Sequence, residues 1–194
     1  TARESSAGCV PDGCARRAPR HGRGNLLCYI RTMSADSLCI TSWRARPVSF
    51  VSLMTLYESN YIRLRALLGD VRGLHGRLVS SAPGDLDLHV ETLEHCRYTT
   101  ILRMTYLFDA DGGRVAEPDL EVRVYHDARL AEASRCARWV RHPGLAELRA
   151  GLPNALGERW LRNMLLNKWL DYCTERGHRP AAAVSAPSFT HGRS

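Results

Sequence analysis

The sequence predicts an α+β domain: a two-layer sandwich in which an antiparallel sheet of four to five strands is flanked by an N-terminal and a C-terminal helix. Two stretches, residues 50–68 and 157–176, repeat apolar residues every three or four positions, as amphipathic helices do. Between them, apolar and polar residues alternate over several segments, as half-buried strands do. The order contains no glycine-rich phosphate loop and no nucleophile elbow, so it does not indicate a nucleotide-binding or hydrolase fold.

The periodic segments all lie between residues 48 and 178, which are predicted to form a single domain. Residues 1–47 carry eight arginines against three acidic residues, with little periodicity. We predict that they are a disordered or spurious basic leader, and a functional basic arm is the alternative. Their apolar run Asn25–Ile30 is too short for a signal peptide or a membrane span. Residues 179–194, rich in alanine, serine and proline, are predicted to be a disordered tail.

The distribution of charge bears on the partners of the domain. The whole chain has 27 basic and 20 acidic residues and a formal net charge of +7. The leader and the tail hold all of this excess, so the net charge of residues 48–178 is zero. Without a basic field the domain is not expected to bind nucleic acid, and no segment predicts a membrane partner.

Three cysteines lie within the domain, at Cys96, Cys136 and Cys173. Their wide spacing predicts free, mostly buried thiols in a reducing compartment, which favours a cytoplasmic protein. A catalytic thiol needs a base beside it, and His95 precedes Cys96. Neighbouring strand residues point to opposite faces, however, so this pair does not predict a nucleophile.

The first helix is predicted over Phe50–Leu68. Ser49 or Ser52 can cap its start, and Gly69 can end it. Its apolar stripe consists of Leu53, Leu56, Tyr57, Tyr61, Leu64, Leu67 and Leu68.

Strand patterns follow the helix. We predict a short strand at Arg77–Ser80, a second one that alternates from Leu86 to Glu91, and a third one from Tyr98 to Phe108. The turn signal Asp109–Gly113 then leads into a strand that starts at Leu120. The even-numbered residues of these strands are expected to pack under the two helices.

The last predicted hairpin has a polar corner at Tyr125, His126 and Asp127. A turn at Asp127–Ala128 would place Val124 opposite Ala131 and Arg123 opposite Glu132, which pairs apolar with apolar and opposite charges with each other. Asp-Ala lacks the glycine that a type I′ turn prefers, so a longer loop is the alternative.

The last helix is predicted over Gly157–Arg176, with Gly177 as its end. Its stripe consists of Leu161, Leu165, Trp169 and Tyr172, broadened by Met164, Leu166 and Cys173. Residues 139–152 give an ambiguous pattern that admits a short helix after Pro143.

Three local patterns resemble the YqiB-like family, a proteobacterial domain of unknown function. They are the helix segment Leu56–Leu64, the hairpin Val122–Ala128 with Ala131 and Glu132, and the last helix around Asn163 and Asn167–Tyr172. The resemblance covers about residues 48–178. It implies a small cytoplasmic bacterial protein and supplies no catalytic residues.

Two functions are compatible with this sequence. The first is a non-enzymatic binding or adaptor domain, in which the exposed face of the sheet contacts an unknown protein partner. The alternative is a small enzyme or ligand-binding protein with a site at Tyr125, His126 and Asp127, joined by Arg123 and Glu132. An imidazole oriented by a carboxylate is suited to general-base chemistry. Strand alternation separates His126 from both neighbours, however, which favours a corner where Asp127 caps the turn and His126 is satisfied near the core edge.

No metal or cofactor is expected. In the leader, Cys9, Cys14 and His21 offer three zinc ligands where a structural site needs four. In the domain, the candidate ligands lack the short spacing that metal sites show; they are His89, His95, Cys96 and His126.

Overall fold

The computed structural model describes residues 49–110, 113–136 and 155–179. The predicted leader, the predicted tail from residue 180 and the ambiguous segment 139–152 therefore lie outside the described residues. The elements are α3 (Phe50–Leu68), the short 3-10 helix η1 (Val71–Gly73), β1 (Arg77–Ser80), β2 (Leu88–His95), β3 (Thr99–Ala110), β4 (Gly113–Tyr125), β5 (Leu130–Cys136) and α5 (Ala155–Arg176).

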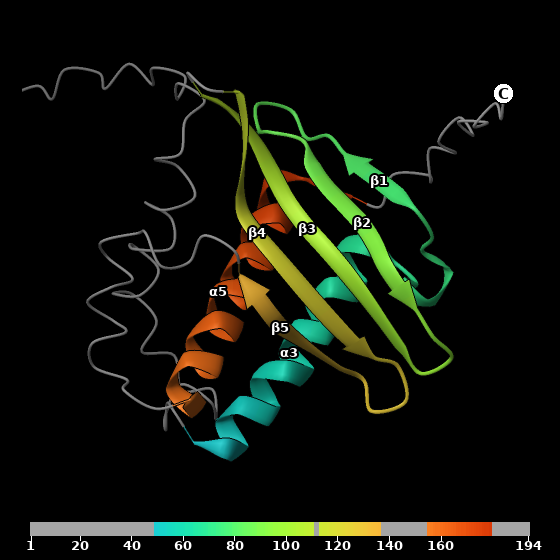
Figure 1. The fold of residues 1–194 in the computed structure, drawn as a ribbon, viewed down its shortest axis with the longest axis vertical. Coiled ribbons are helices and arrows are strands. Elements are labelled where there is room, and N and C mark those ends of the chain that lie inside the picture. Colours follow the sequence, from blue (N-terminus) through green and yellow to red (C-terminus); the bar gives the residue numbers. More distant parts are fainter. Residues whose placement is uncertain (1–48, 111–112, 137–154, 180–194) are drawn as a thin grey trace, which may run out of the picture.

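The five strands form one antiparallel sheet in the order β1-β2-β3-β4-β5, so each strand pairs with its neighbours in the chain. Helices α3 and α5 lie side by side against one face of this sheet (Figure 1). This arrangement confirms the predicted α+β class, with an N-terminal and a C-terminal helix. We call the sheet face that α3 and α5 leave uncovered the outer face.

Helix α3 begins and ends as predicted. Ser49 and Ser52 form a capping box in which each side chain bonds the other's backbone N–H at 3.1 Å. Gly69 ends the helix with a φ of 77°, a conformation that side-chain-bearing residues rarely adopt. Helix α5 begins at Ala155, two residues before the predicted start at Gly157.

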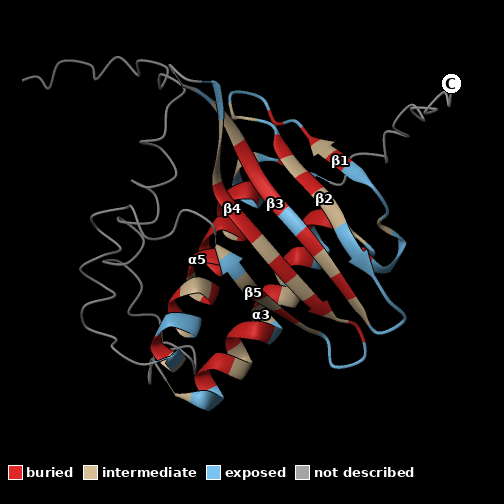
Figure 2. Cartoon of the chain, in the orientation of Figure 1, coloured by how far each residue is buried: buried red, intermediate tan, exposed pale blue. Residues whose placement is uncertain are grey.

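The core lies between the sheet and the two helices. Buried and less buried residues alternate along the strands, and the buried sides of the helices face the sheet (Figure 2). Trp169 of α5 has no exposed surface and packs edge-on against Tyr106 of β3, with the ring centroids 5.4 Å apart. The even-numbered residues of β3 from Thr100 to Tyr106 are buried, as predicted.

The prediction that Tyr98 faces the core is wrong, because 54% of its surface is exposed. It precedes β3 in the turn after β2, where its carbonyl accepts a hydrogen bond from the backbone N–H of His126 at 2.9 Å. Strand alternation therefore does not apply to it. Strand β2 begins at Leu88, later than the predicted start at Leu86. Leu86 nevertheless packs against the core.

Strand β4 is longer than predicted, since it begins at Gly113 and not at Leu120. Its first half includes Pro118, which cannot donate a backbone hydrogen bond. The pairing with β3 shifts register between Thr105 and Leu107, next to this proline. Because of this irregularity, the first half of the strand lacks the strict alternation by which a strand is recognised in a sequence.

Candidate functional site

The β4–β5 hairpin carries the residues that were predicted to form a site. Arg123 pairs with Glu132 and Val124 with Ala131, so the predicted register is confirmed. The strands are joined by a four-residue turn, because Tyr125 pairs with Leu130. The longer of the two predicted loops is therefore the one that forms.

The three corner residues point in different directions. His126 is buried, and its Nε2 lies 2.8 Å from the hydroxyl of Thr100 on β3. Asp127 is exposed and accepts a hydrogen bond from the backbone N–H of Ala128 at 2.9 Å. Tyr125 donates its hydroxyl to Glu132 at 2.8 Å. No carboxylate of this corner therefore hydrogen-bonds the imidazole of His126.

Histidines from three segments meet behind this corner. Thr100 bridges His126 and His95, whose Nδ1 lies 3.2 Å from its hydroxyl. The rings of His95 and His75 are 4.8 Å apart. Burial lowers the pKa of His126, and the positive charge of Arg72 and the nearby His95 lower it further. Within the described residues no group of three His, Cys, Asp or Glu side chains is arranged to hold a metal ion.

The carboxylate of Glu132 accepts hydrogen bonds from the hydroxyls of two tyrosines on different elements. Besides Tyr125, it hydrogen-bonds Tyr57 of α3, whose pKa is raised mainly by burial and then by this carboxylate. Tyr125 also hydrogen-bonds Arg123 and thereby raises the pKa of the Arg123 guanidinium. Arg123, Tyr125 and Glu132 are thus brought together, as their spacing suggested. Only a core role was predicted for Tyr57, because its partner Glu132 lies far along the chain.

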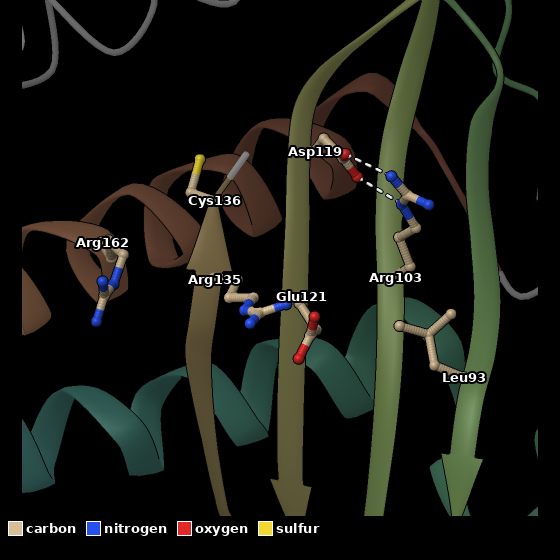
Figure 3. A pocket seen from close by; sticks show the side chains of 7 residues that line it. All are labelled: Leu93, Arg103, Asp119, Glu121, Arg135, Cys136 and Arg162. Atoms are coloured by element: carbon tan, nitrogen blue, oxygen red, sulfur yellow. Dashed lines mark hydrogen bonds and ion pairs between the residues drawn. The ribbon is translucent and has the colours of Figure 1, made fainter. Parts of the chain in front are cut away.

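The outer face is hollowed in a way that the sequence did not reveal. A cavity of about 520 Å³ extends from Leu93 on β2 across β3 and β4 to the end of β5 (Figure 3). Arg103, Asp119 and Glu121 line its middle. Arg135 and Cys136 of β5 line the far side, and Arg162 of α5 lines the hollow beyond the edge strand β5 (Figure 3). A volume of this size lies within the range of small-ligand and peptide sites.

Arg103 and Asp119 form a two-pronged ion pair within this hollow. Arg103 Nε and one terminal nitrogen donate to the two carboxylate oxygens at 2.7 and 2.6 Å. Only 10% of the Asp119 side chain is exposed, so water screens the pair weakly from that side. The pair fixes the guanidinium plane and raises the pKa of Arg103 through the hydrogen bonds to Asp119.

The thiols of Cys96 and Cys173 are not activated. Burial raises the pKa of Cys173 to about 12. Cys96 is exposed, and its hydrogen bond to Glu94 raises its pKa as well. A nucleophilic cysteine needs the opposite shift.

Residues 63–179 match the family described as "Protein of unknown function (DUF1249)". The chain belongs to this family. It is 28% identical over 128 residues to the uncharacterized protein YqiB of Escherichia coli strain K12, which is 66% of this chain and 90% of that protein. The YqiB proteins of E. coli O157:H7 and of E. coli O6:H1 match to the same extent. No solved structure matches the chain. The resemblance found in the sequence is thereby confirmed.

The DUF1249 match contains the whole hollow and the hairpin corner, whereas Tyr57 precedes it. None of the helices among the described residues is long and apolar enough to cross a membrane.

Two buried polar clusters hold the layers together. Asn163 of α5 accepts from the backbone N–H of Ala133 on β5 at 2.8 Å and from Asn60 of α3 at 3.3 Å. At the other end of α5, His178 contacts the Ser80 carbonyl at 2.9 Å and the Tyr106 hydroxyl at 3.1 Å. Both clusters are buried, so we assign them to the architecture of the domain.

Proposed function

We propose that this domain is a non-enzymatic adaptor that binds a protein partner through the outer face of its sheet. The observation that carries the proposal is the hollow of about 520 Å³ on the uncovered face, lined by side chains of four strands and α5. The Arg103–Asp119 pair fixes part of this lining in place. A preorganised surface reduces the entropy lost on binding.

The corner at His126 supports binding more than catalysis. A general base needs a positioned carboxylate or an accessible nitrogen. His126 is buried with its Nε2 against Thr100, and Asp127 bonds the turn backbone. These contacts favour a structural role for the corner.

The nature of the partner is inferred from charge and from the thiols. The zero net charge of residues 48–178 favours a protein over a nucleic acid. Cys96 and Cys173 are free thiols, and Cys96 is exposed, which fits a reducing compartment such as the cytoplasm.

The test is co-purification from cells that naturally express the protein, with two matched variants. Leu93→Asp places a charge in the hollow, where 48% of this leucine is exposed. Ile62→Asp makes a similar change on α3, away from the outer face, at a residue that is 66% exposed. We expect a stoichiometric partner with the wild-type chain and with Ile62→Asp, and its loss with Leu93→Asp.

The proposal fails if no protein is enriched over the Leu93→Asp variant at equal folded stability. It also fails if the partner is lost with Ile62→Asp and kept with Leu93→Asp, because the binding surface would then lie on the helices.

A further inference from the structure

We propose that the hollow binds an acidic side chain of the partner, and that Arg162 and Arg135 recognise its carboxylate. This inference rests on the proposed function and specifies the chemistry of the partner. It identifies one end of the outer-face hollow as an anion site.

The charges that line the hollow leave two guanidinium groups available. Arg103 is committed to Asp119 by two hydrogen bonds. Within the described residues no ion pair engages Arg135 or Arg162. The one remaining carboxylate, Glu121, accepts a hydrogen bond from the Ser134 hydroxyl at 3.3 Å. The lining therefore carries a net charge of about +1, whereas the net charge of residues 48–178 as a whole is zero.

Among the described residues, the Nε–H group of Arg162 has no hydrogen-bond acceptor. Its Nε is buried and has no hydrogen-bond partner in the part of the chain that the structure describes. Buried donors of this kind are rare, because an unmade hydrogen bond destabilises the fold. A carboxylate at this point would accept from Nε and from a terminal nitrogen together, as carboxylates bound to arginine commonly do.

The position of the two arginines defines the ligand further. Arg162 lies on α5 at one side of β5 and Arg135 extends from β5 toward Glu121 on the other side, whereas Leu93 lies at the opposite side of the hollow (Figure 3). A ligand that spans the hollow would meet an apolar contact at one side and cations at the other. A peptide segment with an aliphatic residue followed by one acidic residue has this pattern.

A carboxylate fits better than a phosphate. A phosphate group carries nearly two negative charges near neutral pH and would lie close to Glu121 and Asp119. A single carboxylate balances the single net positive charge of the lining, so we assign the site to an acidic protein segment.

The experiment is an NMR titration of the full chain that follows arginine Nε–Hε resonances. The Arg162 signal is identified by its loss in Arg162→Gln. The probe is the capped peptide Ser-Leu-Ser-Glu-Ser-Ser, and its control has glutamine in place of the glutamate. We expect the Arg162 resonance to move saturably with the first peptide and to stay in place with the second.

Binding of the same peptide is then measured on variants by fluorescence anisotropy. Arg162→Gln and Arg135→Gln should each weaken binding about tenfold or more, as the loss of a charge-assisted hydrogen bond does. Arg77→Gln is the matched control, because Arg77 lies outside the hollow and is 76% exposed in its pair with Glu91. This variant should bind the peptide as the wild-type chain does.

An Arg162 resonance that stays in place up to about 10 mM peptide would overturn the inference, since even weak specific ligands bind in the millimolar range. Movement with inorganic phosphate but not with the acidic peptide would overturn it too and assign the site to phosphate. The proposed function is tested separately, because loss of the partner with Leu93→Asp does not depend on the acidic peptide.

Discussion

The side-chain oxygen of Asn163 on α5 accepts a hydrogen bond from the backbone N–H of Ala133 at 2.8 Å. Ala133 belongs to β5, an edge strand of the sheet, so this donor is not used by a neighbouring strand. Exposed strand edges are templates for pairing with other chains. Helix α5 therefore satisfies part of this edge with a side chain and ties the helix layer to the sheet.

Asn163→Ala should lower the free energy of unfolding by about 2–4 kcal/mol, because the buried N–H of Ala133 and the amide of Asn60 both lose a partner. The urea midpoint at constant m-value is the measurement. Asn163→Asp retains the acceptor oxygen but introduces a buried charge. A midpoint of Asn163→Ala within error of wild type would contradict the edge-capping role.

Trp169 is predicted to be the main anchor of α5. Trp169→Ala should reduce the free energy of unfolding by about 3–5 kcal/mol, through lost burial and a cavity beside Tyr106. Trp160→Ala on the same helix is the control, and it should have a smaller effect because Trp160 is only partly buried. Equal losses in the two variants would show that burial does not set the difference.

The C-terminal limit of the domain is predicted to lie at His178. A chain of residues 48–178 should melt close to the temperature of the full chain, since among the described contacts it loses only the two hydrogen bonds between Arg179 and Ser80. A chain of residues 48–177 should be less stable by about 1–3 kcal/mol. The reason is that the Ser80 carbonyl and the Tyr106 hydroxyl lose their buried contact with His178. Thermal melts of the three chains decide this, and a large loss in the 48–178 chain would mean that the leader or tail contributes to folding.

Acid should destabilise the domain partly through His126. Its folded pKa is lowered from 6.5 by burial and by Arg72 and His95, so below that pH the unfolded chain takes up a proton that the folded chain resists. The free energy of unfolding should therefore fall as the pH drops through about 6.5.

Urea unfolding as a function of pH tests this contribution. His126→Gln should flatten the acid limb relative to the wild-type chain. An identical pH dependence of wild type and His126→Gln would contradict the role of His126. We also expect His126→Gln to retain partner binding, since the proposed binding face does not use the imidazole.

Local patterns were predictable where a short-range rule determines the outcome. The serine cap and glycine end of α3 follow from the sequence, because both depend only on neighbouring backbone. The pairing of Arg123 with Glu132 follows from the two-residue period of strands. The predicted fourth strand starts too late, at Leu120, because Pro118 and a register shift interrupt that period in the first half of β4.

The hollow and the polar clusters could not be predicted, because each depends on which distant segments meet. Leu93 and Arg162 line one cavity although they belong to β2 and α5. Asn60 and Asn163 interrupt the apolar stripes of the two helices. A polar residue at such a position indicates a buried hydrogen-bond partner, but the sequence does not show which residue that partner is. Strand alternation did separate His126 from Tyr125 and Asp127, but only the fold identifies Thr100 as the group it contacts.

The order of the strands also determines when the domain can close during synthesis. Each strand pairs with the preceding one, so hairpins can form locally as the chain leaves the ribosome. The contact between α3 and α5 joins residues 103 positions apart, such as Asn60 and Asn163. Until α5 emerges, the apolar face of the sheet is only half covered and the β5 edge is open. The nascent domain is therefore most exposed to aggregation just before its last helix is made.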